Sequence, residues 1–378
     1  MDRRSFIVRS SVLTGGLALF PSLASAVSGT RTSGSDVFES FKSPDNRYQP
    51  FVRWWWSGGR IEKNELIREL RLLKSVGIGG VEINPIKLPP EADNMGIKPL
   101  DWLSDEWLEM LQITFDEAKR LDMVCDLIVG SGWPFGGEFL QGDERGQVMV
   151  IAVEKFRGPM QLETSAFNIL KASDPAISNP YSGRVPHLVS LRLVPDPVSS
   201  MDQVIDLSDK INAGTIVVDI PEGKHALYAL VRIDAFGEVI NGAPGADGPT
   251  LNHLNKAAVE KYLNKMSDTI EKRTGPLSKN IRSLFTDSLE LEGANWISDM
   301  PEAFKKRNGY DIMPYLPLTM YKTTGMGNVW DYGYGADMSE EFKEMIDRMR
   351  YDVEVTKAEM YRDRFNIPYV EPFEQSGC

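Results

Sequence analysis

One stretch of the sequence decides the fold prediction: FVRWWWSGGRIEKNELIRELRLLKSVGIGGVEINP, residues 51–85. Its first residues, together with the preceding proline (50–56), form a short apolar and aromatic run that ends in glycine, which is typical of a strand. Residues 62–77 place apolar side chains at helical spacing and stop at Gly77, so they predict a helix with a glycine C-cap. A second strand follows at residues 78–85. The stretch therefore predicts a β–α–β unit with parallel strands.

The same alternation recurs further along the chain. A helix is predicted at residues 104–122, with Ser104 as its N-cap, and strands are predicted at 123–130 and 281–288. Another helix fits residues 253–275. Strands and helices in this order favour a parallel sheet, either doubly wound or closed into a barrel.

Two regions depart from the alternation. Residues 148–245 carry short strand patterns broken by Pro, Gly and Asp, with almost no helix signal, which predicts a β-rich insertion after the third strand. A long helix is predicted from about Asp337, with Glu340 completing a capping box. Only four core strands can be counted, whereas a (β/α)8 barrel needs eight.

The N-terminus has the pattern of an export signal. Arg3 and Arg4 precede an apolar run at residues 12–20, and small residues at 24–26 resemble a cleavage site. The arginine pair resembles a twin-arginine signal, which predicts removal on export and a periplasmic or extracellular location. A membrane anchor is the alternative, but the run is too short to span a bilayer.

Composition excludes several classes of function. A formal net charge of −12 makes nucleic acid an improbable partner, because phosphate binding needs clustered Lys and Arg. Two cysteines cannot build a disulfide framework, and three histidines outside an HExxH pattern argue against a histidine-rich zinc site. Cys125 is expected to be a small core residue. Carboxylates remain as the candidates for chemistry.

Polar and aromatic side chains gather where the predicted strands end. In parallel α/β folds this edge of the sheet carries the active site. Aromatic faces, amides and carboxylates are what a sugar site needs, because they match the C–H face, the hydroxyls and the leaving oxygen of a glycoside. The candidates for substrate binding are Trp54, Trp56, Glu82, Asn84, Trp133, Asn295 and Trp296, and the candidates for catalysis are Asp287 and Glu290.

Each candidate also has a structural interpretation. The tryptophans are equally consistent with a core, Glu82 with an interior polar residue bonded to backbone, and Asp287 with an Asx-turn. Because strand side chains alternate, Trp54 and Trp56 share one face and Trp55 takes the other. We expect Trp56, the last before the glycines, to contact the sugar.

Four blocks of the chain together resemble the α-L-rhamnosidases of glycoside hydrolase family 106. The blocks are RWWWSGGRIEKNELIRELRLLKSVGIGGVEINP, LSDEWLEMLQITFDEAKRLDMVCDLIVGSGWPFGG, GPTLNHLNKAAVEKYL and FTDSLELEGANWISDMPEAFKKRNGYD. The resemblance implies a (β/α)8 TIM-barrel-type catalytic domain, inverting cleavage of α-L-rhamnosides, and a calcium ion that assists substrate binding. It implies no calcium ligands in particular.

The resemblance places Glu290 as the general acid and Asp287 as its neighbour. Burial beside Trp296 and repulsion from Asp287 would both raise the pKa of such an acid. Glu292, two residues away, is the competing assignment. Where the family tends to have Asp-His, this chain has Asn252-His253, so a role that needs a charge at residue 252 is in doubt.

The chain departs from the family near its end, where the resemblance puts the general base beyond the last residue. Glu371 and Glu374 are available, but nothing places them at the strand ends. The expected organisation is a signal at 1–26, a linker at 27–45, the first part of the barrel at 46–147, the β-rich insertion at 148–245 and the second part at 246–378, ending before the fifth strand.

The expected function is inverting hydrolysis of terminal α-L-rhamnosides from plant-type glycans or glycosides, with this chain a truncated and inactive fragment. One alternative is an exported carbohydrate-binding protein without catalysis, which would use the same aromatic side chains. Another is a barrel glycosidase that acts on a different sugar.

Overall fold

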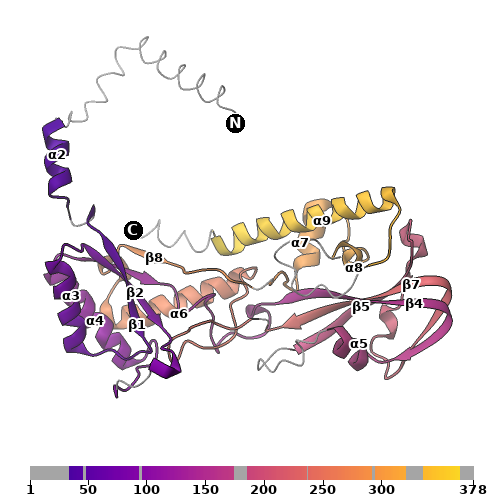
Figure 1. Ribbon diagram of the computed structural model, residues 1–378, viewed down its shortest axis with the longest axis horizontal. Helices are drawn as coiled ribbons and strands as arrows, with labels where there is room; N and C mark the ends of the chain where they lie inside the picture. Colours follow the sequence, from indigo (N-terminus) through magenta and orange to yellow (C-terminus); the bar gives the residue numbers. More distant parts are fainter. Residues whose placement is uncertain are drawn as a thin grey trace, which may run out of the picture.

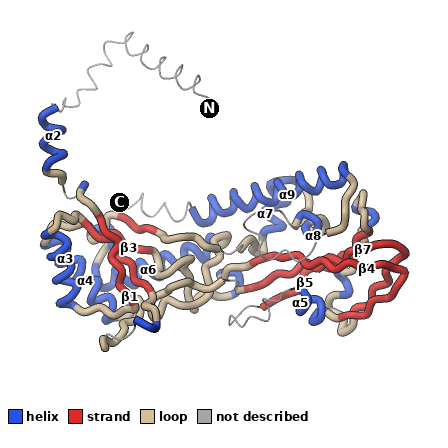
Figure 2. Tube along the Cα trace, viewed as in Figure 1, coloured by secondary structure: helices blue, strands red, loops and turns tan. Residues whose placement is uncertain are grey.

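The computed structural model describes residues 34–45, 48–92, 96–173, 185–235, 237–291, 294–320 and 335–366. Within them the chain forms a parallel sheet and a separate antiparallel sheet, which occupy opposite ends of an elongated molecule (Figures 1 and 2). The signal-like segment 1–26 and the acidic residues Glu292, Glu371 and Glu374 lie outside the described residues.

The parallel sheet confirms the β–α–β prediction. Its strands are β1 (Phe51–Ser57), β2 (Gly80–Ile86), β3 (Val124–Ile128) and β8 (Ser283–Phe285), in the order β1-β2-β3-β8. The helices that accompany them are α3 (Lys63–Ser75), α4 (Asp105–Arg120) and α6 (Lys256–Thr274). All three strand pairs are parallel, as crossover helices require.

The helices bury one apolar side each against this sheet. Leu66 and Leu70 of α3 are four residues apart and both are buried, as helical periodicity predicts. The predicted cap of α4 is confirmed, because Ser104 Oγ accepts a hydrogen bond from the backbone N–H of Trp107 at 3.2 Å. The core that results also contains Trp54, Trp56, Val81, Ile83, Trp107, Leu111, Phe115, Cys125 and Leu127.

The antiparallel sheet lies inside the predicted insertion. Its strands are β4 (Val148–Thr164), β5 (Val185–Pro195), β6 (Ile205–Asp206) and β7 (Ile216–Asp234), in the order β4-β7-β5-β6. The segment also contains a helix that the sequence did not predict, α5 (Ala166–Ser173). Eight residues give too few turns for a clear helical period, and the helix packs on strands β4, β5 and β7.

Three helices near the end of the chain build a second core with this sheet. They are α7 (Met300–Asn308), α8 (Leu316–Thr319) and α9 (Glu340–Tyr361), and a π-helical turn, η8 (Arg362–Asn366), follows α9. The N-cap of α9 is Ser339, whose Oγ accepts from the N–H of Phe342 at 3.4 Å, so the prediction of a start at Asp337 is wrong by two residues. The helix α2 (Gly34–Lys42) stands apart from both sheets (Figure 1).

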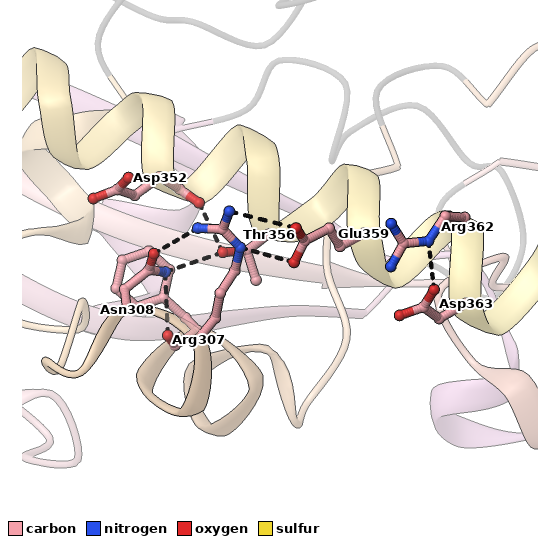
Figure 3. Close-up of polar contacts among 8 residues, drawn as sticks. Arg307, Asn308, Asp352, Thr356, Glu359, Arg362 and Asp363 are labelled. Carbon is pink, nitrogen blue, oxygen red and sulfur yellow. Dashed lines mark hydrogen bonds and ion pairs between the residues drawn. The ribbon is translucent and has the colours of Figure 1, made fainter.

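Polar contacts join α7 to the C-terminal part of α9 (Figure 3). Arg307 Nε donates to Glu359 at 2.8 Å, and Asn308 Nδ2 donates to Thr356 Oγ1 at 3.2 Å. Beyond α9, the Arg364 guanidinium binds both oxygens of Asp299 at 2.8 and 2.9 Å. These contacts join α9 to α7 and η8 to the residue before α7, and η8 also lies against α6. No helix among the described residues combines the length and apolar character needed to cross a membrane.

Candidate active site

One face of the parallel sheet carries a layer of polar side chains. The strand register sets Arg53 beside Glu82, Glu82 beside Asp126, and Asp126 beside Ser283. Side chains alternate along a strand, so these residues lie opposite the face that packs on the helices. All four strands, β1, β2, β3 and β8, thus contribute a side chain to this polar layer.

Arg53 links the two edges of this sheet. Its Nε donates to Glu82 at 3.3 Å and its Nη1 donates to Asp287 at 2.8 Å, although Asp287 lies 234 residues further along the chain. The guanidinium carbon also lies 5.2 Å from the ring centre of Phe285, within the range of a cation–π contact. Arg53 therefore fixes both carboxylates relative to the sheet.

Asp287 makes two polar contacts, and the one to backbone reaches the next residue, Ser288, so it is not the Asx-turn that the sequence allowed. Its Oδ1 accepts a hydrogen bond from the backbone N–H of Ser288 at 2.8 Å, which restricts the turn after β8. Its Oδ2 accepts from Arg53. The turn and the ion pair together orient this carboxylate.

Glu290 lies in the same segment but in a different environment. It is exposed, and no hydrogen bond or ion pair joins it to another described residue. The expected burial beside Trp296 is not found, because Trp296 is buried in the second core with Met300 and Phe304. The physical reason is that the chain turns after β8, so that residues 290 and 296 face different surroundings.

The side-chain amide of Asn295 is bound to backbone. Its Oδ1 accepts from the N–H of Met149 at 2.8 Å, and its Nδ2 donates to the carbonyl of Met149 at 3.2 Å. This pair ties the segment after β8 to the start of β4. Trp296 is buried in the second core, whereas a substrate contact of Asn295 stays a prediction.

The three tryptophans of β1 divide between core and surface, but not as predicted. Trp54 donates from Nε1 to Glu69 at 2.6 Å, and Trp56 is 1% exposed and packs edge-on against Trp107 at 5.6 Å between ring centres. Trp55 is 45% exposed and lies on the same strand face as Arg53. The expectation of a sugar contact at Trp56 is wrong because the helices take the face that Trp54 and Trp56 share.

The remaining predicted residues keep positions compatible with a site. Glu82 is partly exposed and bound to Arg53. Asn84 lies beside Trp55 in the register and is 1% exposed, yet neither polar atom of its amide has a hydrogen-bond partner among the described residues. An unsatisfied buried amide costs about 1–3 kcal/mol, and a ligand contact at Asn84 stays a prediction because its two polar atoms have almost no accessible surface. Trp133 is half-buried, and its backbone pairs with Ile240 at 3.0 and 3.1 Å.

On β1, two residues of this face, Arg53 and Trp55, were not among the site residues predicted from the sequence. The alternation of β1 was a sufficient signal to group them, since they are two residues apart. Whether these two side chains belong to a site depends on which face of β1 packs on the helices. For Arg53 it also depends on Asp287, which follows β8 and lies 234 residues further along the chain. Neither fact follows from local spacing.

The fit of the expected calcium ion can be tested on the carboxylates. Among the described ranges, no three His, Cys, Asp or Glu side chains are grouped so that they could hold a metal ion. Asp126, the most buried carboxylate of the layer, is already bound by Arg282 and by the backbone N–H of Ser283 at 3.1 Å. The described residues therefore do not form a carboxylate site for calcium.

Comparison with known proteins gives three results. The family described as Glyco_hydro_106, alpha-L-rhamnosidase, matches residues 42–158 and 189–361. A protein of Formosa agariphila described as "Putative beta-glucuronidase" is 24% identical over 345 residues, a match that covers 79% of this chain and 28% of that protein. The structure of a rhamnosidase from Novosphingobium sp. PP1Y superposes with a TM-score of 0.61 at 17% identity, covering 89% of this chain and 46% of the other. The chain thus spans less than half of each of these relatives.

Proposed function

Because the chain belongs to the α-L-rhamnosidase family of glycoside hydrolases, we propose that it contributes to the inverting hydrolysis of terminal α-L-rhamnosides. The observation that carries the proposal is the Arg53 bridge, which fixes Asp287 and Glu82 on the sheet face that also presents Trp55. Trp55 takes the place that we expected for Trp56, as the flat surface for the C–H face of the sugar.

The fold expected around this site is a (β/α)8 barrel. The parallel sheet with crossover helices and the structural similarity to a rhamnosidase support this expectation. The relatives extend well beyond the matched part, so we propose the activity for a protein that also supplies the second carboxyl group.

In the proposed reaction, Glu290 donates a proton to the glycosidic oxygen. Its exposure and its lack of a partner among the described residues leave the carboxyl group accessible to a leaving group. Asp287 cannot easily swing to the same place, because Arg53 and the N–H of Ser288 hold both of its oxygens. The second carboxylate would activate water across a gap of about 6.5–9.5 Å, which is the separation that inversion requires.

A different sugar is the second candidate, since one relative is described as a β-glucuronidase. A glucuronide carries a carboxylate. Arg53 is already paired with two carboxylates, so a third negative group at this face would be repelled. The contacts therefore favour a neutral sugar, and a non-catalytic sugar-binding protein remains the further alternative.

The test uses a protein that carries this chain together with the additional length of its relatives, assayed with aryl α-L-rhamnoside and aryl β-glucuronide. We expect turnover of the rhamnoside, and a loss of rate by 100-fold or more in Glu290→Gln with little change in affinity, as for removal of a general acid. Glu302→Gln, at an exposed position in the first turn of α7, is the matched control. Preferential hydrolysis of the glucuronide, or full activity of Glu290→Gln, would overturn the proposal.

We also propose that the arginine pair near the N-terminus directs export. Cell fractionation of the wild type and of an Arg3→Lys, Arg4→Lys variant tests this proposal. Retention of both proteins in the cytoplasm would contradict it.

A further inference from the structure

The loop after β3 is bound to a segment that follows the antiparallel sheet. Residues 130–137 form the loop, and residues 237–250 form the segment that lies against it. The N–H of Trp133 donates to the carbonyl of Ile240 at 3.0 Å, and the N–H of Ile240 donates back to the carbonyl of Trp133 at 3.1 Å. The loop and the segment therefore form one backbone unit where β3 ends, at the edge of the sheet that carries active sites in parallel α/β folds.

The close approach of these two backbones requires glycine at residue 132. A Cβ atom on Gly132 would lie 2.4 Å from the carbonyl oxygen of Ile240 and 2.6 Å from the backbone nitrogen of Gly242. The φ of Gly132 is also +69°, a conformation that glycine adopts without steric cost. The glycine at this position therefore serves contact with the chain's own backbone.

The side chain of Ser131 joins this unit to the neighbouring strand. Ser131 is 1% exposed, and its Oγ donates to the carbonyl of Pro85 at 2.7 Å and accepts from the N–H of Ala243 at 2.8 Å. A hydroxyl group has one proton to donate, so donating and accepting at the same time fixes its orientation. Pro85 belongs to β2, so Ser131 connects the end of β2 with the loop after β3 and with residues 237–250.

The same unit carries one accessible aromatic side chain. Within residues 130–137, Trp133 alone is not buried. It lies two residues after Ser131, and its own N–H and carbonyl are both bound to Ile240. The backbone on either side of the indole ring is therefore fixed by contacts to β2 and to residues 237–250. A rigid indole ring with accessible surface is suited to stacking on the C–H face of a sugar.

We propose that Ser131 is a positioning residue for substrate binding that acts through Trp133, because it holds the loop after β3 so that the indole ring meets a neutral sugar. The inference rests on the proposed function for the class of sugar. Loss of the hydroxyl leaves the carbonyl of Pro85 and the N–H of Ala243 buried without this partner, so the loop and residues 237–250 move apart. The indole ring then loses its fixed position.

The experiment measures binding and turnover separately, in the longer protein that tests the proposed function. Titration calorimetry with L-rhamnose gives the dissociation constant and the fraction of protein that binds, and an aryl α-L-rhamnoside gives kcat and KM. Ser131→Ala should raise the dissociation constant and KM by about tenfold and leave kcat within about twofold, which is the pattern of lost substrate binding. A loss of stability alone would lower the binding fraction and kcat together, with the dissociation constant and KM unchanged.

A double-mutant cycle tests whether Ser131 acts through Trp133. Trp133→Ala should itself weaken the binding of L-rhamnose, and Ser131→Ala should add no further loss in that background, because the group that it positions is absent. Gly132→Ala forces the same two backbones apart without touching the hydroxyl, so it should reproduce the effect of Ser131→Ala. Both variants should speed hydrogen exchange at Ala243, measured by mass spectrometry of the peptide that contains it.

Two matched controls should leave the dissociation constant of L-rhamnose unchanged. Ser190→Ala removes another buried hydroxyl, which has no partner among the described residues and belongs to β5 of the antiparallel sheet. Gly77→Ala places a Cβ atom at a φ of +87°, where no atom beyond the adjacent residues lies within 4 Å.

Several results would overturn the inference. They are an unchanged dissociation constant in Ser131→Ala, a loss of equal size with and without Trp133, and an absence of L-rhamnose binding by the wild type. Turnover of the rhamnoside with a KM that does not respond to Ser131→Ala would refute this inference alone. Binding of L-rhamnose that responds to Ser131→Ala, without any turnover, would refute the proposed function alone.

Discussion

Replacing Trp56 by alanine should destabilise the protein far more than the same replacement at Trp55. Trp56 is 1% exposed and contacts Trp54 and Trp107 edge-on, at 5.8 and 5.6 Å between ring centres. A tryptophan buries about 200 Å² of surface, which at about 25 cal/mol per Å² corresponds to about 5 kcal/mol. Measured Trp→Ala changes in cores are about 3–5 kcal/mol. Trp55 keeps 45% of its surface in water, so by the same estimate its replacement should cost about 3 kcal/mol or less, and it leaves no cavity in the core.

The free energy of unfolding should be measured by guanidinium denaturation followed by far-UV circular dichroism, because both variants lose a fluorophore. Trp56→Phe serves as a control, since it keeps an aromatic ring and removes an indole N–H that has no partner among the described residues. It should cost less than Trp56→Ala. Equal losses in Trp55→Ala and Trp56→Ala would refute the assignment of the two strand faces.

Three further predictions concern other parts of the chain. Asn295→Ala should lower the free energy of unfolding, measured by chemical denaturation, by about 1–3 kcal/mol, because it leaves the backbone N–H and C=O of Met149 without their partner. A loss near zero would show that these two hydrogen bonds do not stabilise the fold. The two arginines that bind Glu117, above all Arg120, lower its pKa from 4.5 to about 2, so the stabilisation is present at neutral pH and is lost as the pH falls from about 4.5 to 2. Denaturation midpoints of wild type and Glu117→Gln should therefore converge in acid, and a constant difference would contradict the pairing. Burial raises the pKa of the Cys125 thiol to about 12, so labelling of its peptide, followed by mass spectrometry, should require global unfolding and should not occur in the native state.

Local patterns were sufficient for most of the parallel part of the fold. The apolar spacing of residues 62–77 and the bounding glycines predict α3 and the strands on either side of it, because burial of one helix face leaves a direct trace in the sequence. Such traces weaken in short elements. The eight residues of α5 gave no helix signal, and Ser339 rather than Asp337 caps α9, since both residue types are suitable N-caps and only the backbone angles distinguish them.

The candidate site was predicted less well than the fold. The segment after β8 and the residues Glu82 and Asn84 do lie at the parallel sheet, and the family match supports the glycosidase assignment. Sugar contacts of Trp56 and Trp296 do not agree with the burial of both side chains in the two cores. Residue type suggests what a side chain can bind, but packing decides whether it is accessible.

The amino-acid sequence by itself determined the alternation of strands and helices, the position of the β-rich insertion and the pairing of Trp54 with Trp56 on one strand face. Those features follow from interactions between residues that are near one another in the chain. Only the tertiary structure decided that the helices cover the face of Trp56, that Trp55 stays exposed and that Arg53 reaches Asp287. The physical reason is that an ion pair across 234 residues, and the choice of a buried face, depend on how the strands are ordered in the sheet and on what packs against them.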